Sequence, residues 1–196
     1  MKLLISDPPS AISRSKNPND MIDTIEILLA AWGMIGLGIL IAFGGASATF
    51  GIGLALLVFS LGVAGTIFYG WLLHIVMGNL GGKGKFYHGL TALTYAKFPI
   101  AFGVLVACIL WHLPPLGMFL SLIVLIIFSL MGLSTLYRSV KDFFAVDMIT
   151  AWIGISIIIL GTLLSTYILA LGAISTLGGL STGGFPQLMM MNRMLY

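Results

Sequence analysis

The chain has 196 residues, of which 59% are hydrophobic and 8% are charged, and its formal net charge is +3. Its mean hydropathy is +1.12. Soluble domains carry about 25% charged residues, so this composition excludes a soluble globular protein and predicts an all-α bundle of membrane-spanning helices. The single cysteine, Cys108, excludes an intrachain disulfide. The sequence has no basic stripe with interleaved aromatic residues, so nucleic acid is not expected as a partner.

The first segment, residues 1–24, is mostly polar and contains three prolines, which preclude a long helix. The first long apolar run begins only near Ile25 and is too long for a signal peptide. We therefore expect residues 1–24 to form a retained, exposed N-terminal tail. Asp20, Asp23 and Thr24 stand where the start of a helix favours negative charge and capping oxygens.

Five apolar segments follow, and together they predict a five-helix membrane domain over residues 25–173. The expected spans are Ile25–Phe43, Phe50–Met77, Phe98–Leu113, Leu116–Tyr137 and Ile149–Ala173. Residues 84–96 alternate aromatic and polar side chains, so we expect them to lie along the membrane interface. Pro99 then falls in the first turn of the third span, where its missing N–H costs little. Residues 174–196 are expected to form a glycine- and methionine-rich C-terminal tail.

The distribution of positive charge predicts the orientation of the chain. An odd number of spans places the two ends on opposite sides of the membrane. With the N-terminus in the cytoplasm, eight of the nine Lys and Arg residues lie on the cytoplasmic side or at its boundary, and Arg193 alone lies outside. The sequence therefore predicts a cytoplasmic N-terminus and an external C-terminus.

The longest polar break between the first and fourth expected spans is Gly81-Gly82-Lys83-Gly84-Lys85-Phe86-Tyr87. Glycine permits backbone angles that other residues avoid, and lysines must stay in water or among lipid headgroups. We interpret this stretch as a shaped loop at a membrane surface. The candidate residues for binding a partner protein or lipid headgroups are Gly82, Lys83, Gly84, Lys85, Phe86, Tyr87 and, in the preceding span, His74. Alternatively, the two lysines act only as charges that fix the topology.

Several kinds of chemistry are not favoured. The loop does not match a phosphate-binding motif, because Met77 stands where the first glycine is required and Gly84 follows Lys83. His74 and His112 belong near opposite ends of their spans, about 30 Å apart, which disfavours a shared metal site. No Ser/His/Asp grouping stands out for nucleophilic catalysis. We expect no catalytic residue, no metal site and no cofactor.

Two further observations bear on binding and transport. Met189, Met190, Met191 and Met194 could hold Cu(I) through their thioethers, but an apolar tail packed on a partner is the simpler interpretation. No carboxylate falls in the middle of a predicted span, which disfavours a channel or transporter.

The loop resembles that of the Yip1 family of membrane proteins. The residues that carry the resemblance are His74, Leu80-Gly81-Gly82-Lys83-Gly84-Lys85-Phe86, and Leu90 to Pro99. The family pattern has a histidine in the second span, a Gly-Gly-Lys-Gly-x-Phe loop and an apolar segment ending in proline. A second match, Leu133 to Lys141, corresponds to a polar inner loop of the family. The resemblance implies five spans, a cytoplasmic N-terminus and a non-enzymatic role.

The expected function is thus that of an integral membrane scaffold or accessory protein whose partners are membrane lipids and other integral membrane proteins. Family members that bind Rab-type GTPases carry a longer N-terminal region, and this chain lacks its motifs. It is more similar to short prokaryotic members, which implies a prokaryotic cell membrane, with the ER or Golgi membrane as the alternative. Two other functions stay open, namely a structural subunit of a bioenergetic or transport complex and a small channel or transporter.

Overall fold

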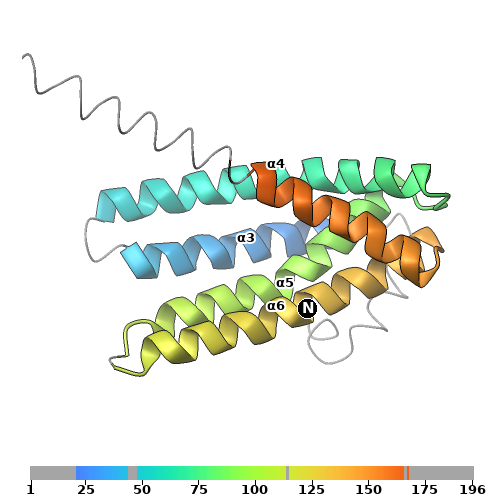
Figure 1. The fold of residues 1–196 in the computed structure, drawn as a ribbon. Coiled ribbons are helices and arrows are strands. Elements are labelled where there is room, and N and C mark those ends of the chain that lie inside the picture. Colours follow the sequence, from blue (N-terminus) through green and yellow to red (C-terminus); the bar gives the residue numbers. More distant parts are fainter. Residues whose placement is uncertain (1–20, 44–47, 114, 166, 168–196) are drawn as a thin grey trace, which may run out of the picture. The chain divides into compact units, whose positions relative to one another are not determined.

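The structure is a computed structural model that describes residues 21–43, 48–113, 115–165 and 167. Within these ranges, five helices are long and apolar enough to cross a membrane, and every regular element is helical (Figure 1). They are α3 (Met21–Phe43), α4 (Ala48–Asn79), α5 (Phe86–Leu110), α6 (Gly117–Phe144) and a fifth helix, Met148–Ser165. The predicted all-α fold with five spans is confirmed. Most of the expected N-terminal tail, the turn at 44–47 and the whole expected C-terminal tail lie outside the described residues.

The chain divides into two compact units, one ending at Ile155 and the other beginning at Ser156. The first unit contains α3 to α6 and the start of the fifth helix. In the second unit, the Thr162 hydroxyl donates to the Ile158 carbonyl at 2.8 Å, which keeps a polar side chain satisfied within its own helix. All features described below belong to the first unit.

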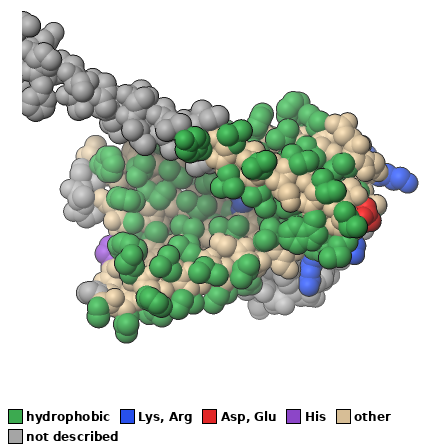
Figure 2. Space-filling model, viewed as in Figure 1, with side chains coloured by type: hydrophobic (Ala, Val, Ile, Leu, Met, Phe, Trp, Pro, Cys, Tyr) green, Lys and Arg blue, Asp and Glu red, His purple; other side chains and the backbone are tan. Residues whose placement is uncertain are grey.

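Helix α5 is the centre of the first unit, because it packs against α3, α4 and α6 (Figure 1). In its most apolar stretch 44% of the residues are buried, compared with 17% to 28% in the other four candidate spans. The remaining helices expose most of their large apolar side chains, as lipid-facing helices do. Figure 2 shows these hydrophobic side chains covering one face of the molecule, while the acidic side chains and most of the basic ones gather at one end.

The prediction for the third span was wrong. Helix α5 begins at Phe86, twelve residues before the expected start, and residues 89–96 are all buried instead of lying along the interface. Pro99 therefore lies inside the helix and not in its first turn. A helix that is covered by neighbours on several sides shows no single apolar stripe. The mixed apolar and polar pattern of residues 84–96 therefore looked like that of an interfacial segment. Neighbouring helices also make an internal proline tolerable in a membrane bundle.

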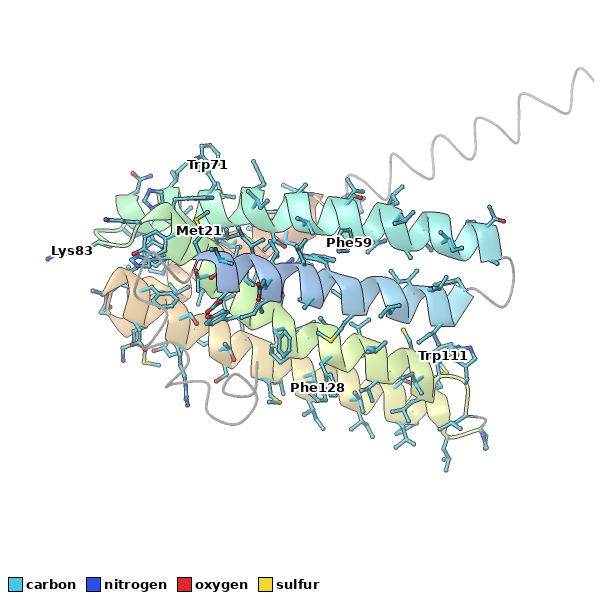
Figure 3. The ribbon with its side chains drawn as sticks, turned by 180° about the vertical axis from the view of Figure 1, so that it is seen from behind. Met21, Phe59, Trp71, Lys83, Trp111 and Phe128 are labelled. Carbon is cyan, nitrogen blue, oxygen red and sulfur yellow. The ribbon has the colours of Figure 1, made fainter. Side chains whose placement is uncertain are left out.

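Three other helices run further than expected. Helix α3 begins at Met21, inside the expected N-terminal tail, α4 ends at Asn79 and α6 ends at Phe144. Contacts between helices fix their relative levels. The hydroxyl oxygens of Thr24 and Thr91 lie 3.2 Å apart, which places the start of α3 beside the first turns of α5. We call residues 73–90 and 138–147 the loop end of the molecule. Figure 3 shows Lys83 beyond Met21 and far from Trp111, which lies at the opposite end.

Candidate functional site

Helix α4 ends in a left-handed turn that directs the chain into the loop. The Gly82 N–H donates to the Met77 carbonyl at 2.8 Å, and the Gly81 N–H donates to the Gly78 carbonyl at 3.1 Å. Gly81 has a φ of +87°, a conformation that glycine adopts without strain. This pair of bonds around a left-handed glycine is the Schellman motif, which satisfies the last carbonyls of a helix. The first of the loop's three glycines therefore ends α4.

The other two glycines let the loop lie directly on Phe144, the last residue of α6. A Cβ atom at Gly82 would lie 3.2 Å from the Cβ of Phe144 and 2.9 Å from the Met77 carbonyl oxygen. A Cβ atom at Gly84 would overlap the Phe144 ring. Between them, the Lys83 N–H donates to the Phe144 carbonyl at 3.0 Å. Phe144 is completely buried, so it forms a platform on which the loop backbone rests.

The lysines of the loop point the other way. Residues 82–85 lie between α4 and α5, and along them Gly82 and Gly84 are half-buried while Lys83 and Lys85 are exposed. In an extended chain, successive side chains alternate between two faces. The Gly-Lys-Gly-Lys pattern thus places its glycines on Phe144 and presents both ammonium groups to the surroundings. The labelled Lys83 side chain extends outward in Figure 3.

A histidine fixes the start of α5 immediately after the lysines. The Lys85 N–H donates to Nδ1 of His88 at 3.0 Å, so one of the otherwise unpaired N–H groups at the helix start is satisfied. The His88 ring stacks on Phe143, with ring centroids 5.4 Å apart and an interplanar angle of 16°. Phe143 and Phe144 at the end of α6 therefore support the helix start and the loop, respectively.

The remaining predicted site residues lie in different surroundings. Phe86 opens α5 and lines a pocket of about 490 Å³ with Trp71 and three apolar residues of α4. The Tyr87 carbonyl accepts a hydrogen bond from the Thr91 hydroxyl at 2.8 Å. His74 is half-buried in α4, and its Nδ1 is buried without a hydrogen-bond partner among the described residues. The structure thus brings Gly82, Lys83 and Gly84 together on the platform, places Phe86 against α4, and gives His74 no hydrogen bond to the loop.

The surface around the loop is rich in exposed charge. Arg138 and Lys141 of α6 are exposed, as are the two loop lysines, and the carboxylates in this region are Asp142 and Asp147. Asp147 accepts from the Ile149 N–H at 3.2 Å and the Thr150 N–H at 3.4 Å, which caps the fifth helix. Hydrogen bonding to Thr150 is the largest cause that lowers the pKa of Asp147 below its ordinary value. The four exposed basic side chains suit the binding of anionic surfaces or acidic partners.

A second polar group lies deeper in the bundle and was not expected there. Lys97 was predicted at the membrane boundary, yet it falls within α5, eleven residues after Phe86. Its ammonium nitrogen lies 4.4 Å from the ring centroid of Trp32 on α3. The Trp32 indole N–H donates to the Thr66 hydroxyl of α4 at 2.9 Å. The three helices are therefore joined by a polar chain inside the candidate spans.

In the part of the chain that the structure describes, no group of three His, Cys, Asp or Glu residues could hold a metal ion. Comparison with known proteins gives no match to a family model, a curated protein or a solved structure. The resemblance to the Yip1 family therefore stays a prediction that depends on the residues of the loop.

The sequence did not predict the residues of α6 on which the loop packs. Phe143, Phe144 and the left-handed Ala145 belong to a stretch expected to be an inner loop, whereas α6 continues through Phe144. One signal could have suggested that a buried side chain packs on the loop backbone. Gly82 and Gly84 alternate with lysines, and glycines at alternate positions often mark the close approach of another group. Nothing in the sequence indicated which aromatic ring would fill that place.

Proposed function

We propose that this chain is a non-enzymatic membrane scaffold of Yip1 type, which holds other membrane components through its glycine–lysine loop. The observation that supports this proposal is the structure of the loop, in which two glycines lie on the buried Phe144 and two lysines point outward. A loop that served only to end one helix and start another would not need this close seating. In this proposal the loop end faces the cytoplasm, as the excess of Lys and Arg on that side favours.

The proposed partners are anionic lipid headgroups and acidic faces of other integral membrane proteins. Each lysine near an anionic membrane surface contributes about 1 kcal/mol, so the loop lysines together supply about 2 kcal/mol, or roughly thirtyfold in affinity. Arg138 and Lys141 lie on the same end and extend the basic surface. A prokaryotic cell membrane is the proposed location, which is what the resemblance to short prokaryotic members of the Yip1 family implies.

The test is a pull-down of tagged variants from native membranes at low and high salt. We expect Lys83→Ala with Lys85→Ala to keep expression and insertion but to lose most bound partner or anionic lipid. The matched control is Arg138→Ala with Lys141→Ala, which removes the same charge from α6 and should have the smaller effect. If the loop variant retains every partner and lipid at the wild-type level, the loop acts only in topology and the proposed function is wrong.

A third variant separates shape from charge. Gly82→Val keeps both lysines but places a branched side chain against the Met77 carbonyl and Phe144. We expect it to weaken the same association at low and at high salt, because it displaces the loop and leaves its charge unchanged. If high salt alone reduces the binding of the wild type by as much as Gly82→Val does, the whole effect is instead assigned to charge.

A further inference from the structure

Lys97 carries the only charge that lies well inside a candidate span among the described residues. The hydroxyl contact between Thr24 and Thr91 sets the level at which α3 begins, and Lys97 lies six residues beyond Thr91 on α5. At the rise of an α-helix, six residues correspond to about 9 Å. From the same level, α3 continues for nineteen residues to Phe43, about the thickness of a bilayer's hydrocarbon core. The lysine is therefore placed within the hydrocarbon region.

The ammonium group is held inside by its neighbours. It lies over the ring of Trp32, which is eight residues, or about 12 Å, along α3 from Thr24. A lysine that extends toward the headgroups would leave this ring. Contact with the tryptophan face offsets part of the cost of removing the charge from water, but a cation in hydrocarbon ordinarily also pairs with an anion.

No such anion is present at this depth in the described part of the chain. Its carboxylates are Asp23, Glu26, Asp142 and Asp147, and all four lie at or near the loop end. None of them lies within ion-pair distance of Lys97. A parallel second copy would bring these four groups at the same levels, so the described part of a second copy would not supply a carboxylate at the depth of Lys97.

Two buried threonines lie near the level of Lys97. Thr94, one turn before Lys97 on α5, is completely buried, and its hydroxyl has no hydrogen-bond partner among the described residues. Gly70 of α4 lies against Leu90 of α5. Counting four residues along each of these antiparallel helices places Thr66 beside Thr94. The ammonium group of Lys97, which is not fully buried, provides the donors for an incoming acceptor.

We propose that Lys97 pairs with the carboxylate of an Asp or Glu carried inside the bilayer by a transmembrane helix of a partner protein. Lys97 is only half-buried, so such a helix can reach it from the surface of the bundle. A lipid phosphate lies too far outward to meet an ammonium held at Trp32, whereas a helix carries its carboxylate at a fixed depth. This inference rests on the proposed scaffold function and specifies the chemistry of its partner.

The test uses synthetic leucine–alanine membrane-spanning peptides that carry a single Asp, Asn or Leu at the depth of Lys97. Binding to the full-length protein in phosphatidylcholine vesicles is followed by energy transfer from a label on the protein's N-terminus. We expect the Asp peptide to bind about tenfold more tightly than the Leu peptide, in line with polar contacts between model membrane helices. Lys97→Met should remove this preference and Lys97→Arg should retain it. Equal binding of the three peptides to the wild type would overturn the proposal without any variant.

A charge exchange guards against a merely structural effect of the substitution. Lys97→Asp should prefer a peptide with Lys at the same position, and restored preference supports direct pairing. Loss of the Asp preference on adding phosphatidylglycerol would identify a lipid as the occupant, and Lys97-dependent self-association without peptide would identify a second copy. Either result would overturn the proposal. Lys83→Ala with Lys85→Ala should leave peptide binding unchanged, so this test and the loop test fail independently.

Discussion

The loop end and the spans of this protein differ in the proportions of large and small side chains that they bury. Helix α6 contains both cases, because Phe144 is completely buried at the loop end while Phe119 in the span is 72% exposed. The loop end encloses large apolar residues, namely Leu73, Met77, Val140, Phe143 and Phe144. The spans bury some large residues too, such as Leu28, Phe98 and Ile155. Small residues form much of what they bury, namely Gly36, Gly38, Ala101, Gly103, Ala107, Ser121 and Gly132.

With the loop end outside the lipid, as we propose, the solvent at each level accounts for the difference. In water, burying large apolar side chains drives folding. In lipid that driving force is absent between helices, so small residues that permit close packing occupy the interfaces. The loop end therefore resembles a small water-exposed core attached to a membrane bundle, and the binding loop is seated on that core. The following predictions test this contrast.

The largest expected effect comes from removing the platform. Phe144→Ala deletes a fully buried ring, for which large-to-small changes in a core cost about 3–5 kcal/mol. The matched control is Phe119→Ala on the lipid-facing side of the same helix, which should leave stability nearly unchanged. Thermal unfolding in mild detergent, followed by the loss of monodisperse protein, compares the two. Similar losses in both variants would show that the loop end has no core of its own.

A smaller effect is expected from filling the space above the platform. Gly84→Ala places a methyl group against the Phe144 ring, and overpacking of this kind costs about 1–3 kcal/mol. Gly78→Ala in α4 is the control, because a Cβ atom there meets nothing within 4 Å. In this variant the better helix propensity of alanine should give equal or slightly higher stability. A harmless Gly84→Ala would contradict the close seating of the loop.

The two left-handed residues at the helix ends predict a pair of opposite changes. Ala145 has a φ of +53°, which costs a residue with a Cβ roughly 1 kcal/mol, so Ala145→Gly should stabilise the protein by about that amount. Gly81→Ala, at a φ of +87°, should destabilise it by a similar amount. The same unfolding assay measures both, and two changes of equal sign would contradict a left-handed conformation at one of the two positions.

The smallest expected effect is the pH dependence of the Asp147 cap. Its pKa is lowered in the folded protein, so its contribution to stability is complete above the pKa of the unfolded chain. The contribution is lost as the pH falls through the lower folded value. Asp147→Asn keeps a capping oxygen but cannot titrate, so the wild type should lose more stability than this variant between pH 6 and pH 3. Parallel curves would show that the cap contributes nothing.

The sequence predicted what hydropathy controls and missed what tertiary packing controls. The five candidate spans and the shaped loop followed from long apolar runs and from the glycines and lysines between them. The start of α5 was missed because Lys97 and Pro99 are ordinary boundary signals, whereas here they lie inside a helix covered by α3, α4 and α6.

Only the loop itself, and not the platform under it, could be predicted from the sequence. The outward lysines and the need for backbone freedom at Gly82 and Gly84 are local properties of the loop. The platform is not local, because Phe144 lies about sixty residues further along the chain and reaches the loop only when α6 packs against α5. Single-sequence patterns carry no information on such a pairing.

The central claim is that the loop end stands outside the lipid on the cytoplasmic side, with its lysines presented. Labelling of single cysteines by an impermeant thiol reagent tests it most directly, in a Cys108→Ala background. We predict that Lys83→Cys reacts only after the cells are permeabilised, that Leu116→Cys at the opposite end reacts in intact cells, and that Phe119→Cys in the span reacts in neither. Labelling of Lys83→Cys in intact cells, or no labelling after permeabilisation, would contradict the account.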